Sequence, residues 1–266
     1  MSTSGQPVDP TAYSEEYFLT ECDGYKEYLA HDGTALSERL ETLRRFLRIS
    51  PGMRVLDVGC GRGEMVVQCG LNGVFAVGVD YAPVGLQLAQ RVVARTGERD
   101  GDAWKRPGLS LGNAKRLPFT DDTFDRAIMS DIVEHLYPDE LRAVLEEVHR
   151  VLIPGGELLV HTMPNLWYYR YGYPLFRLAQ RLRGVRLPAD PRDRIKFSHV
   201  HVNEQTPRAL RRALRHSPFS HWRVWLHDYR TYSQYGPMMR RSMGLLTGLP
   251  LVKQVFCDDI FALVRK

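Results

Sequence analysis

Two acidic residues and three glycines make residues 57–64 the part of the sequence best suited to bind a ligand. The run begins at Asp57 and ends at Glu64, and between them stand Gly59, Gly61 and Gly63. Glycines let the backbone pass close to a bound molecule. Another carboxylate, Asp80, follows 21 residues after Gly59, a spacing at which an acid can accept hydrogen bonds from both hydroxyls of a ribose. The pattern predicts a site for a nucleotide-like molecule.

The kind of nucleotide follows from the position of Glu64. A dinucleotide site has the pattern G-x-G-x-x-G and holds a pyrophosphate at a helix N-terminus. Here the third glycine, Gly63, comes one residue early, and Glu64 stands where that pattern has glycine. A carboxylate there would repel a pyrophosphate but would tolerate a cation without phosphate, such as S-adenosylmethionine. A nicotinamide oxidoreductase is the disfavoured alternative, and the cofactor that protects the protein against heat would distinguish the two.

The elements that must position these residues read as alternating strands and helices. Val55–Val58 is apolar enough for the buried centre of a parallel sheet. Three more short apolar runs follow it as predicted strands, and a helix from Pro138 to Leu152 and the turn Pro154–Gly156 lead into a fifth strand ending near Thr162; the three runs are 75–80, 109–112 and 124–130. Because ligands of open α/β sheets bind at the carboxyl ends of the strands, Gly59 and Asp80 are expected at one edge.

The segment VLDVGCGRGE resembles the first motif of class I S-adenosylmethionine-dependent methyltransferases, and Asn113–Phe119 is similar to their G-D-A-x-x-L-P-F. The chain thus looks like a type 11 or ubiquinone-biosynthesis-like methyltransferase. The resemblance implies an α/β fold, a Rossmann-like seven-stranded sheet with helices on both faces, with strands six and seven at 222–228 and 259–264. It implies S-adenosylmethionine as cofactor, bound by Asp57, Gly59, Gly61, Gly63, Asp80, Tyr81, Asn113, Ala114 and Ser130. Asn113 replaces an acid that holds the adenine amino group in the family, and its amide oxygen can still accept that hydrogen bond.

The same resemblance divides the chain. Residues 1–50 are expected to form an N-terminal cap with a helix over 35–49, and residues 51–266 the methyltransferase domain, with insertions at about 163–198 and 230–257. Tyr17 and Tyr25 of the cap are candidates for the cofactor or substrate pocket, with ordinary packing as the alternative. The first dozen residues read as disordered.

Composition fits an enzyme of the reducing cytoplasm. A chain of 266 residues can bury a sizeable core, and no apolar run approaches the roughly 18 residues that a membrane span needs. The cysteines show no metal-ligand spacing; they are Cys22, Cys60, Cys69 and Cys257. We expect a cytoplasmic protein, with peripheral contact to a membrane as a second expectation.

That second expectation comes from the two insertions. Between Arg170 and Lys196 stand eight basic residues and two acidic ones, close to six aromatic residues between Trp167 and Phe176. Arginines among aromatics suit an anionic substrate, a membrane surface or single-stranded nucleic acid, and a solvated, packed helix explains them as well. Because the basic charge is confined to one insertion, nucleic acid is disfavoured.

The second insertion contains Pro237–Leu246, a mixture of Met, Leu and Arg typical of an adaptable amphipathic surface. Two insertions of this kind, expected to cover the acceptor site, favour a small-molecule or lipid-like acceptor with a substantial apolar part, or docking to a bilayer. Packing between the insertions, or a homodimer interface, is the alternative.

Methyl transfer is an in-line displacement at the sulfonium carbon, and the acceptor can need a base. His135 is the predicted catalytic residue, because the segment after the fourth strand lies beside the methyl group in the family and a histidine pKa near 6.5 suits a base. The alternative is that Glu134 and His135 only cap and orient the next helix.

A metal site is a further alternative, although we predict none. Asp131, Glu134 and His135 form D-x-x-E-H, which a helical turn places on one face. Similar motifs in methyltransferases of ubiquinone biosynthesis and in small-RNA 2′-O-methyltransferases bind a divalent ion with a distant histidine. His199, eight residues before Pro207, matches that histidine, whereas His201 matches one that is frequent in metal-free relatives.

We therefore predict methyl transfer from S-adenosylmethionine to a small-molecule or lipid-like metabolite, at oxygen or nitrogen. The alternatives are a metal-assisted O-methyltransferase of a membrane-associated aromatic or isoprenoid substrate, and a non-catalytic module that binds the cofactor.

Overall fold

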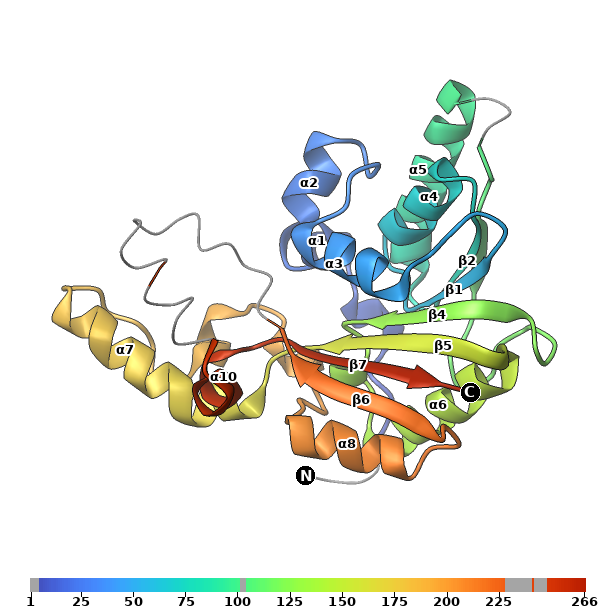
Figure 1. The fold of residues 1–266 in the computed structure, drawn as a ribbon. Coiled ribbons are helices and arrows are strands. Elements are labelled where there is room, and N and C mark those ends of the chain that lie inside the picture. The colour runs from blue at the N-terminus through green and yellow to red at the C-terminus, as the bar shows by residue number, and fades with distance from the viewer. Residues whose placement is uncertain (1–4, 101–103, 228–240, 242–247) are drawn as a thin grey trace.

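A seven-stranded sheet lies between two layers of helices in the computed structural model, which describes residues 5–100, 104–227, 241 and 248–266 (Figure 1). The strand order is β3-β2-β1-β4-β5-β7-β6, and β7 runs antiparallel to both of its neighbours while the other pairs are parallel. The Rossmann-like fold predicted from the sequence is confirmed. The strands are β1 (Arg54–Val58), β2 (Phe75–Asp80), β3 (Gly108–Leu111), β4 (Phe124–Ser130), β5 (Leu152–Thr162), β6 (His221–Leu226) and β7 (Ile260–Arg265).

Each central strand is buried on both faces, because its alternate residues pack against different helices. Val55 packs with α3 (Glu38–Leu47) and α4 (Glu64–Leu71). Leu56 belongs to the core on the opposite side, under α6 (Pro138–Val151) and α8 (Pro207–Arg215). The long helix α5 (Pro83–Asp100) stands beside α4 and packs against the N-terminal cap (Figure 1). This double burial explains the continuous apolar strands of the sequence.

Strands β3, β6 and β7 differ by one or two residues from their predicted bounds, and two other differences have a structural cause. Helix α6 ends at Val151 and β5 begins at once, so Pro154–Gly156 lies inside the strand. Phe124 of β4 pairs with Leu152 of β5, and Arg126 pairs with Glu157, so the register shifts between them. Pro154–Gly156 therefore lies in a bulge of β5 in place of the predicted turn. Helix α3 is shorter than 35–49, because Ser37 caps it by accepting a hydrogen bond from the backbone of Leu40.

The N-terminal cap lies over the carboxyl ends of β1 and β2. It consists of η1 (Pro10–Ala12), α1 (Glu15–Thr20) and α2 (Tyr25–Ala30). Arg62 of the glycine loop binds the cap by donating hydrogen bonds to the backbone carbonyls of Phe18 and Asp23. The prediction of disorder is wrong for residues 5–12, because the Tyr81 hydroxyl donates to the Val8 carbonyl at 2.9 Å and Ala12 packs against the cap. The division of the chain at residue 50 stays a prediction.

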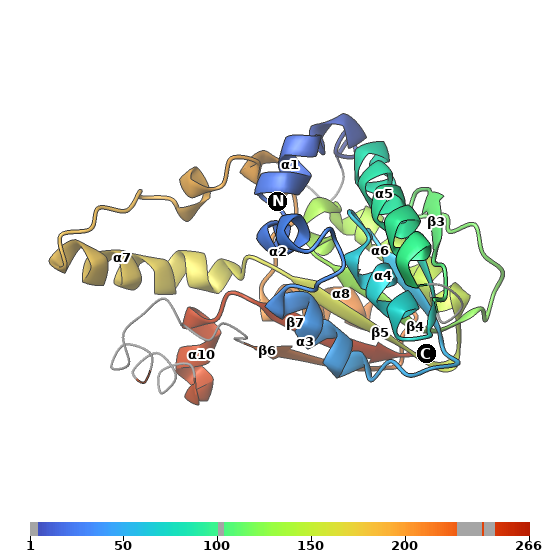
Figure 2. The same cartoon turned by 90° about the horizontal axis from the view of Figure 1, so that it is seen from above.

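The first insertion leaves the body of the molecule and returns to the cap. It contains η4 (Tyr168–Gly172), α7 (Tyr173–Leu182), η5 (Pro191–Arg194) and η6 (Ser198–Val200). Helix α7 projects away from the sheet, and the returning chain reaches α1 (Figure 2). The contact is made by Lys196, which is ion-paired with Glu16, and by the rings of Phe197 and Tyr17, 5.4 Å apart.

The second insertion includes α10 (Pro250–Phe256), which packs beneath η4. The predicted amphipathic surface at 237–246 lies, apart from Arg241, outside the described residues. Within the described ranges, no helix has the length and apolar character to cross a bilayer.

Candidate functional site

A cavity of about 390 Å³ lies between the cap and the carboxyl ends of β1, β2 and β4. It has the size of a small-molecule site. It brings together seven of the residues predicted for cofactor or chemistry: Asp57, Gly59, Gly61, Asp80, Tyr81, Ser130 and His135. Tyr17 of the cap also lines it, whereas Tyr25 does not and instead packs under the amino group of Lys26.

Three predicted cofactor residues are not in the cavity wall. Gly63 begins α4 with φ 81°, and a side chain there would meet Ala89 at 2.8 Å, so this glycine lets α4 and α5 approach closely. Asn113 is exposed and its side-chain oxygen accepts from the backbone of Lys115 at 3.0 Å. Ala114 packs against the core.

Asp80 holds the glycine loop in shape. Its two carboxylate oxygens accept hydrogen bonds from the backbone N–H groups of Gly61 and Ala82, each at 2.8 Å. Gly59 and Gly61 have φ of 75° and 49°, a conformation that favours glycine. Each carboxylate oxygen has a second lone pair, so Asp80 can accept from a ligand as well.

The cavity wall carries two acids, Asp57 and Asp80, that form no ion pair with any described residue. Asp57 is buried, and burial, with the nearby charges of Asp80 and Glu64, raises its pKa to about 7. Burial also raises the pKa of Asp80. Glu64 differs because Arg62 pairs with it at 2.6 Å. The argument from Glu64 against a pyrophosphate is thus weaker than the sequence implied, and Asp57 and Asp80 provide the negative field that favours a cationic ligand.

Arg39 is a cavity residue that the sequence reading missed. It comes from α3, is only 7% exposed, and its Nη1 donates to Asp131 Oδ2 at 2.6 Å. Its Nε lies 3.8 Å from Asp23. Nothing in the local sequence separates it from the other arginines of that helix. It places a positive charge at the end of the cavity near Asp131.

Asp131 belongs to a buried charge network. Its Oδ1 lies 2.9 Å from His161 Nδ1, and His161 Nε2 lies 3.1 Å from Asp259. Burial opposes charge on both groups, yet Asp131 and Asp259 raise the pKa of His161 to about 9, and Arg39 and His161 hold the pKa of Asp131 below its usual range. Asp131 is therefore engaged with Arg39 and His161.

His135 is bonded to the cap through a second missed residue. Its Nδ1 lies 3.1 Å from the hydroxyl of Tyr13, which is 5% exposed and also lines the cavity. Burial, with the nearby positive charge of His201, lowers the pKa of His135 to about 3. Burial raises the pKa of Tyr13, so the phenol stays protonated. The pair can form one hydrogen bond in either direction.

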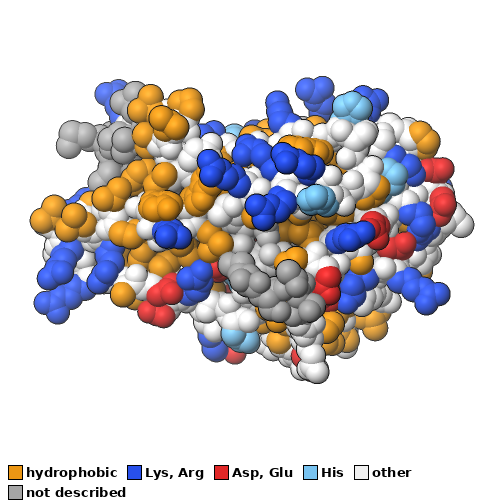
Figure 3. Space-filling model, turned by 90° about the horizontal axis from the view of Figure 1, so that it is seen from below, with side chains coloured by type: hydrophobic (Ala, Val, Ile, Leu, Met, Phe, Trp, Pro, Cys, Tyr) orange, Lys and Arg blue, Asp and Glu red, His pale blue; other side chains and the backbone are white. Residues whose placement is uncertain are grey.

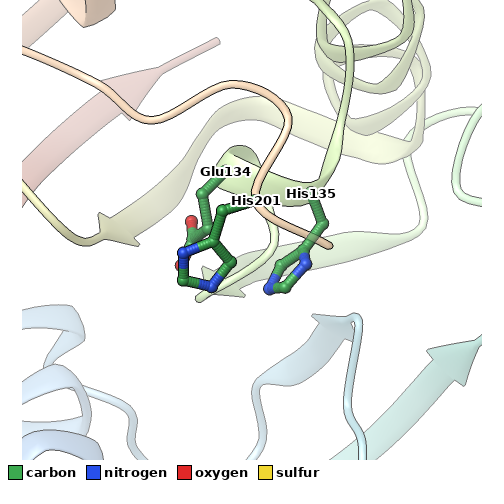
Figure 4. Close-up of side chains that lie close together, drawn as sticks. All are labelled: Glu134, His135 and His201. Carbon is green, nitrogen blue, oxygen red and sulfur yellow. The ribbon is translucent and has the colours of Figure 1, made fainter. Parts of the chain in front are cut away.

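Glu134, His135 and His201 converge, and one possible ligand atom of each lies within 4.8 Å of the other two (Figure 4). Glu134 also accepts from the Thr162 hydroxyl at 2.7 Å. Of the four residues that the sequence nominated for a metal, Asp131 is ion-paired elsewhere and His199 is exposed beside Phe197, their rings 6.2 Å apart. His201 joins the pair in place of His199.

Comparison with known proteins shows what this chain is similar to. Residues 56–160 match the family described as "Methyltransferase domain". A demethylmenaquinone methyltransferase of Bacillus mycoides is 34% identical over 142 residues, which are 52% of this chain and 56% of that protein. An uncharacterized methyltransferase of Synechocystis is 34% identical over 125 residues, 46% of this chain and 54% of that protein. The chain thus covers little more than half the length of these curated relatives.

Solved structures share the whole fold. A SAM-dependent methyltransferase from Archaeoglobus fulgidus superposes with a TM-score of 0.54 at 19% identity, over 90% of this chain and 99% of its own. A geranyl diphosphate methyltransferase in complex with SAM superposes with a TM-score of 0.56 at 19% identity, over 97% of this chain and 95% of its own. At this identity the likeness shows the fold.

Proposed function

The chain carries a class I S-adenosylmethionine-dependent methyltransferase domain, and we propose that it methylates a small-molecule or lipid-like acceptor at an oxygen or nitrogen atom. The observation that carries this proposal is the pair of buried acids at the glycine loop. Asp57 has a pKa raised to about 7 and lines the cavity beside Asp80. An ammonium or sulfonium group near Asp57 would relieve the cost of ionising it.

Four groups of this chain suit the cofactor. Asp80 is proposed to accept from the ribose hydroxyls, and the backbone at Gly59 and Gly61 to let the molecule pass. Asp57 is proposed to pair with the amino group, and Arg39 with the carboxylate, because it is a buried cation in the cavity wall. When bound, S-adenosylmethionine supplies a methyl group on a positively charged sulfur.

The acceptor side of the cavity is aromatic and apolar. Tyr13 and Tyr17 come from the cap, and Ile195 and Phe197 from the returning end of the first insertion. These walls suit an acceptor with an apolar body. The name of the similar demethylmenaquinone methyltransferase points in the same direction. Contact of the protein with a membrane, where such molecules reside, is part of the proposal.

Tyr13 and His135 together offer a route for a proton. Tyr13 lines the cavity and its hydroxyl bonds to His135 Nδ1. We propose that the phenol oxygen accepts the proton of the acceptor while its own proton passes to Nδ1. His135, the base nominated by the sequence, then acts through Tyr13. Its lowered pKa makes the imidazole a weaker base than the value near 6.5 that the sequence-based prediction assumed, so we expect the proton to leave the acceptor as the methyl group is transferred and not before.

A second candidate function is metal-assisted O-methylation. Glu134, His135 and His201 offer one oxygen and two nitrogen ligands within 4.8 Å of one another. Such a set suits Mn²⁺, Fe²⁺ or Zn²⁺ better than Mg²⁺. A divalent ion there would lower the pKa of an acceptor hydroxyl.

One experiment tests the main proposal. Calorimetry with S-adenosylhomocysteine measures cofactor binding, and turnover with labelled S-adenosylmethionine is followed over quinol, isoprenoid and fatty-acyl acceptors. Binding with transfer to one acceptor class is expected, and Asp57→Asn should weaken binding while Asp32→Asn, at an exposed loop position, should not. Binding without transfer to any class would favour the non-catalytic module. Absence of binding would overturn the proposal.

A further inference from the structure

Helix α7 exposes a stripe of large apolar side chains. Leu175, Leu178 and Leu182 are 55%, 56% and 82% exposed, and their spacing of three and four residues places them on one face of the helix. Tyr171 before the helix and Val185 after it are 50% and 46% exposed. Large apolar side chains gathered in this way mark a binding surface.

Five arginines lie on α7 or within a few residues of its ends. They are Arg170, Arg177, Arg181, Arg183 and Arg186. Asp190 of the same insertion is already paired with Arg192, and among the described residues no carboxylate pairs with Arg181, Arg183 or Arg186. Seen from below, hydrophobic side chains cover the side of the molecule on which α7 projects, with Lys and Arg at their margin (Figure 3). The surface combines apolar contact with uncompensated positive charge.

A second apolar element lies at the base of α7. Gly172 leaves room for the backbone of Val255, since a side chain there would meet that carbonyl oxygen at 2.2 Å. Leu249 caps the helix α10 packed there and Leu251 lies in its first turn; the two are 56% and 84% exposed. The exposed leucines therefore come from two elements, α7 and α10, that both pack against η4.

We propose that the α7 surface, defined as Tyr171, Leu175, Leu178, Leu182 and the neighbouring arginines, docks onto an anionic phospholipid bilayer. The leucines would enter the boundary between headgroups and acyl chains, and the arginines would contact the phosphates. Charge decides between a bilayer and a second copy of the chain. Two copies meeting through α7 would bring two sets of unpaired arginines together, whereas an anionic surface compensates them.

The same insertion joins this surface to the cavity. It leaves β5 at Met163 and Pro164 and returns at Ile195 and Phe197, and all four residues line the cavity. Its outer part forms α7 (Figure 2). A protein docked through α7 therefore holds the walls of its acceptor site on the segment that touches lipid. This link to the acceptor rests on the proposed function; the docking itself does not.

Flotation with vesicles tests the docking. The wild type should float with phosphatidylcholine vesicles that contain phosphatidylglycerol, and poorly with phosphatidylcholine alone or at high salt. Leu182→Asp should lower the partition coefficient roughly tenfold or more. It removes a leucine that would enter the lipid and adds a negative charge that the anionic lipid repels. Leu29→Asp is the matched control, since Leu29 is 58% exposed on α2. It should bind as the wild type does.

Two further measurements separate the possible failures. Calorimetry with S-adenosylhomocysteine should give equal affinities for the wild type and both variants, so that loss of flotation is not loss of folding. A wild type that ignores anionic vesicles, or a Leu29→Asp protein that loses flotation equally, overturns the docking. So does a lipid-free dimer that Leu182→Asp dissociates while neither protein floats, because the surface is then an interface between copies. Flotation by a protein that fails to bind the cofactor product would refute the proposed function and leave the docking intact.

Discussion

The hydroxyl of Tyr13 lies 3.1 Å from Nδ1 of His135, although 122 positions separate the two residues in the sequence. The hydrogen bond joins the N-terminal cap to the turn after β4, at the wall of the cavity. One hydrogen bond therefore links the position of the cap to that of the candidate base. A change in either residue should affect the same step of the reaction.

The first prediction concerns that pair. Tyr13→Phe keeps the ring contacts with Tyr17 and Tyr81 and removes only the hydroxyl. We expect kcat to fall by about 10²-fold, within the range for a proton-transfer group, with unchanged affinity for S-adenosylhomocysteine. Adding His135→Ala should cost little more, because both residues serve one proton route. Tyr25→Phe, outside the cavity wall, is the control, and equal loss there or additive losses in the double variant would contradict the route.

The second prediction concerns Asp80. Asp80→Ala should weaken S-adenosylmethionine binding by about 2 kcal/mol, the scale of hydrogen bonds to a charged group. Asp80→Asn retains one oxygen and should weaken it less. Titration calorimetry measures both, with Asp32→Ala as an exposed control. Asp80 also accepts from the backbone of Gly61 and Ala82, so the loss includes any change in the loop. Unchanged affinity in Asp80→Ala would remove Asp80 from the proposed cofactor site.

The third prediction follows from the pKa of Asp57, which is raised from 3.8 to about 7. The folded state binds the Asp57 proton more tightly than the unfolded state does, so the contribution of Asp57 to stability is full at low pH and is lost as the pH rises through about 7. Asp57→Asn lacks this loss. Its free energy of unfolding should gain on the wild type by about 1 kcal/mol per pH unit between roughly pH 5 and pH 7 and then level off. Urea denaturation at several pH values measures the two free energies of unfolding. A difference between the two proteins that does not change with pH would refute the prediction.

The fourth prediction separates the proton route from a metal. We expect turnover to persist in the presence of EDTA. The His199→Ala protein should also be active, because the His199 side chain is exposed. If Glu134, His135 and His201 hold an ion, EDTA should abolish turnover, Mn²⁺ should restore it, and His201→Ala should fail while still binding the cofactor product. Metal analysis of the purified protein gives a second readout. Rescue by Mn²⁺ together with an inactive His201→Ala protein would establish the metal site.

Much of the site was visible in the sequence because its residues are close along the chain. Asp57, Gly59 and Gly61 follow one strand directly, and Asp80 ends the next. Parallel pairing of β1 with β2 must bring these ends together. For the same reason the sheet and its helices could be predicted, since apolar strands and capped helices are local patterns. The bulge in β5 could not, because strand pairing overrode the turn signal of Pro154–Gly156.

The remaining residues depend on contacts between distant segments. Tyr13 directly follows the stretch that was predicted to be disordered, and only the structure shows the contacts of this region with Tyr81 and His135. Arg39 is one of several arginines in α3 until packing buries it beside Asp131. The choice of His201 over His199 is decided by which side of the returning chain faces Glu134. The sequence by itself determined the glycine loop and the acids at the ends of β1 and β2, because they follow from local order along the chain. The tertiary structure alone decided Arg39, Tyr13 and His201, because burial and partner choice there arise between segments far apart in the chain.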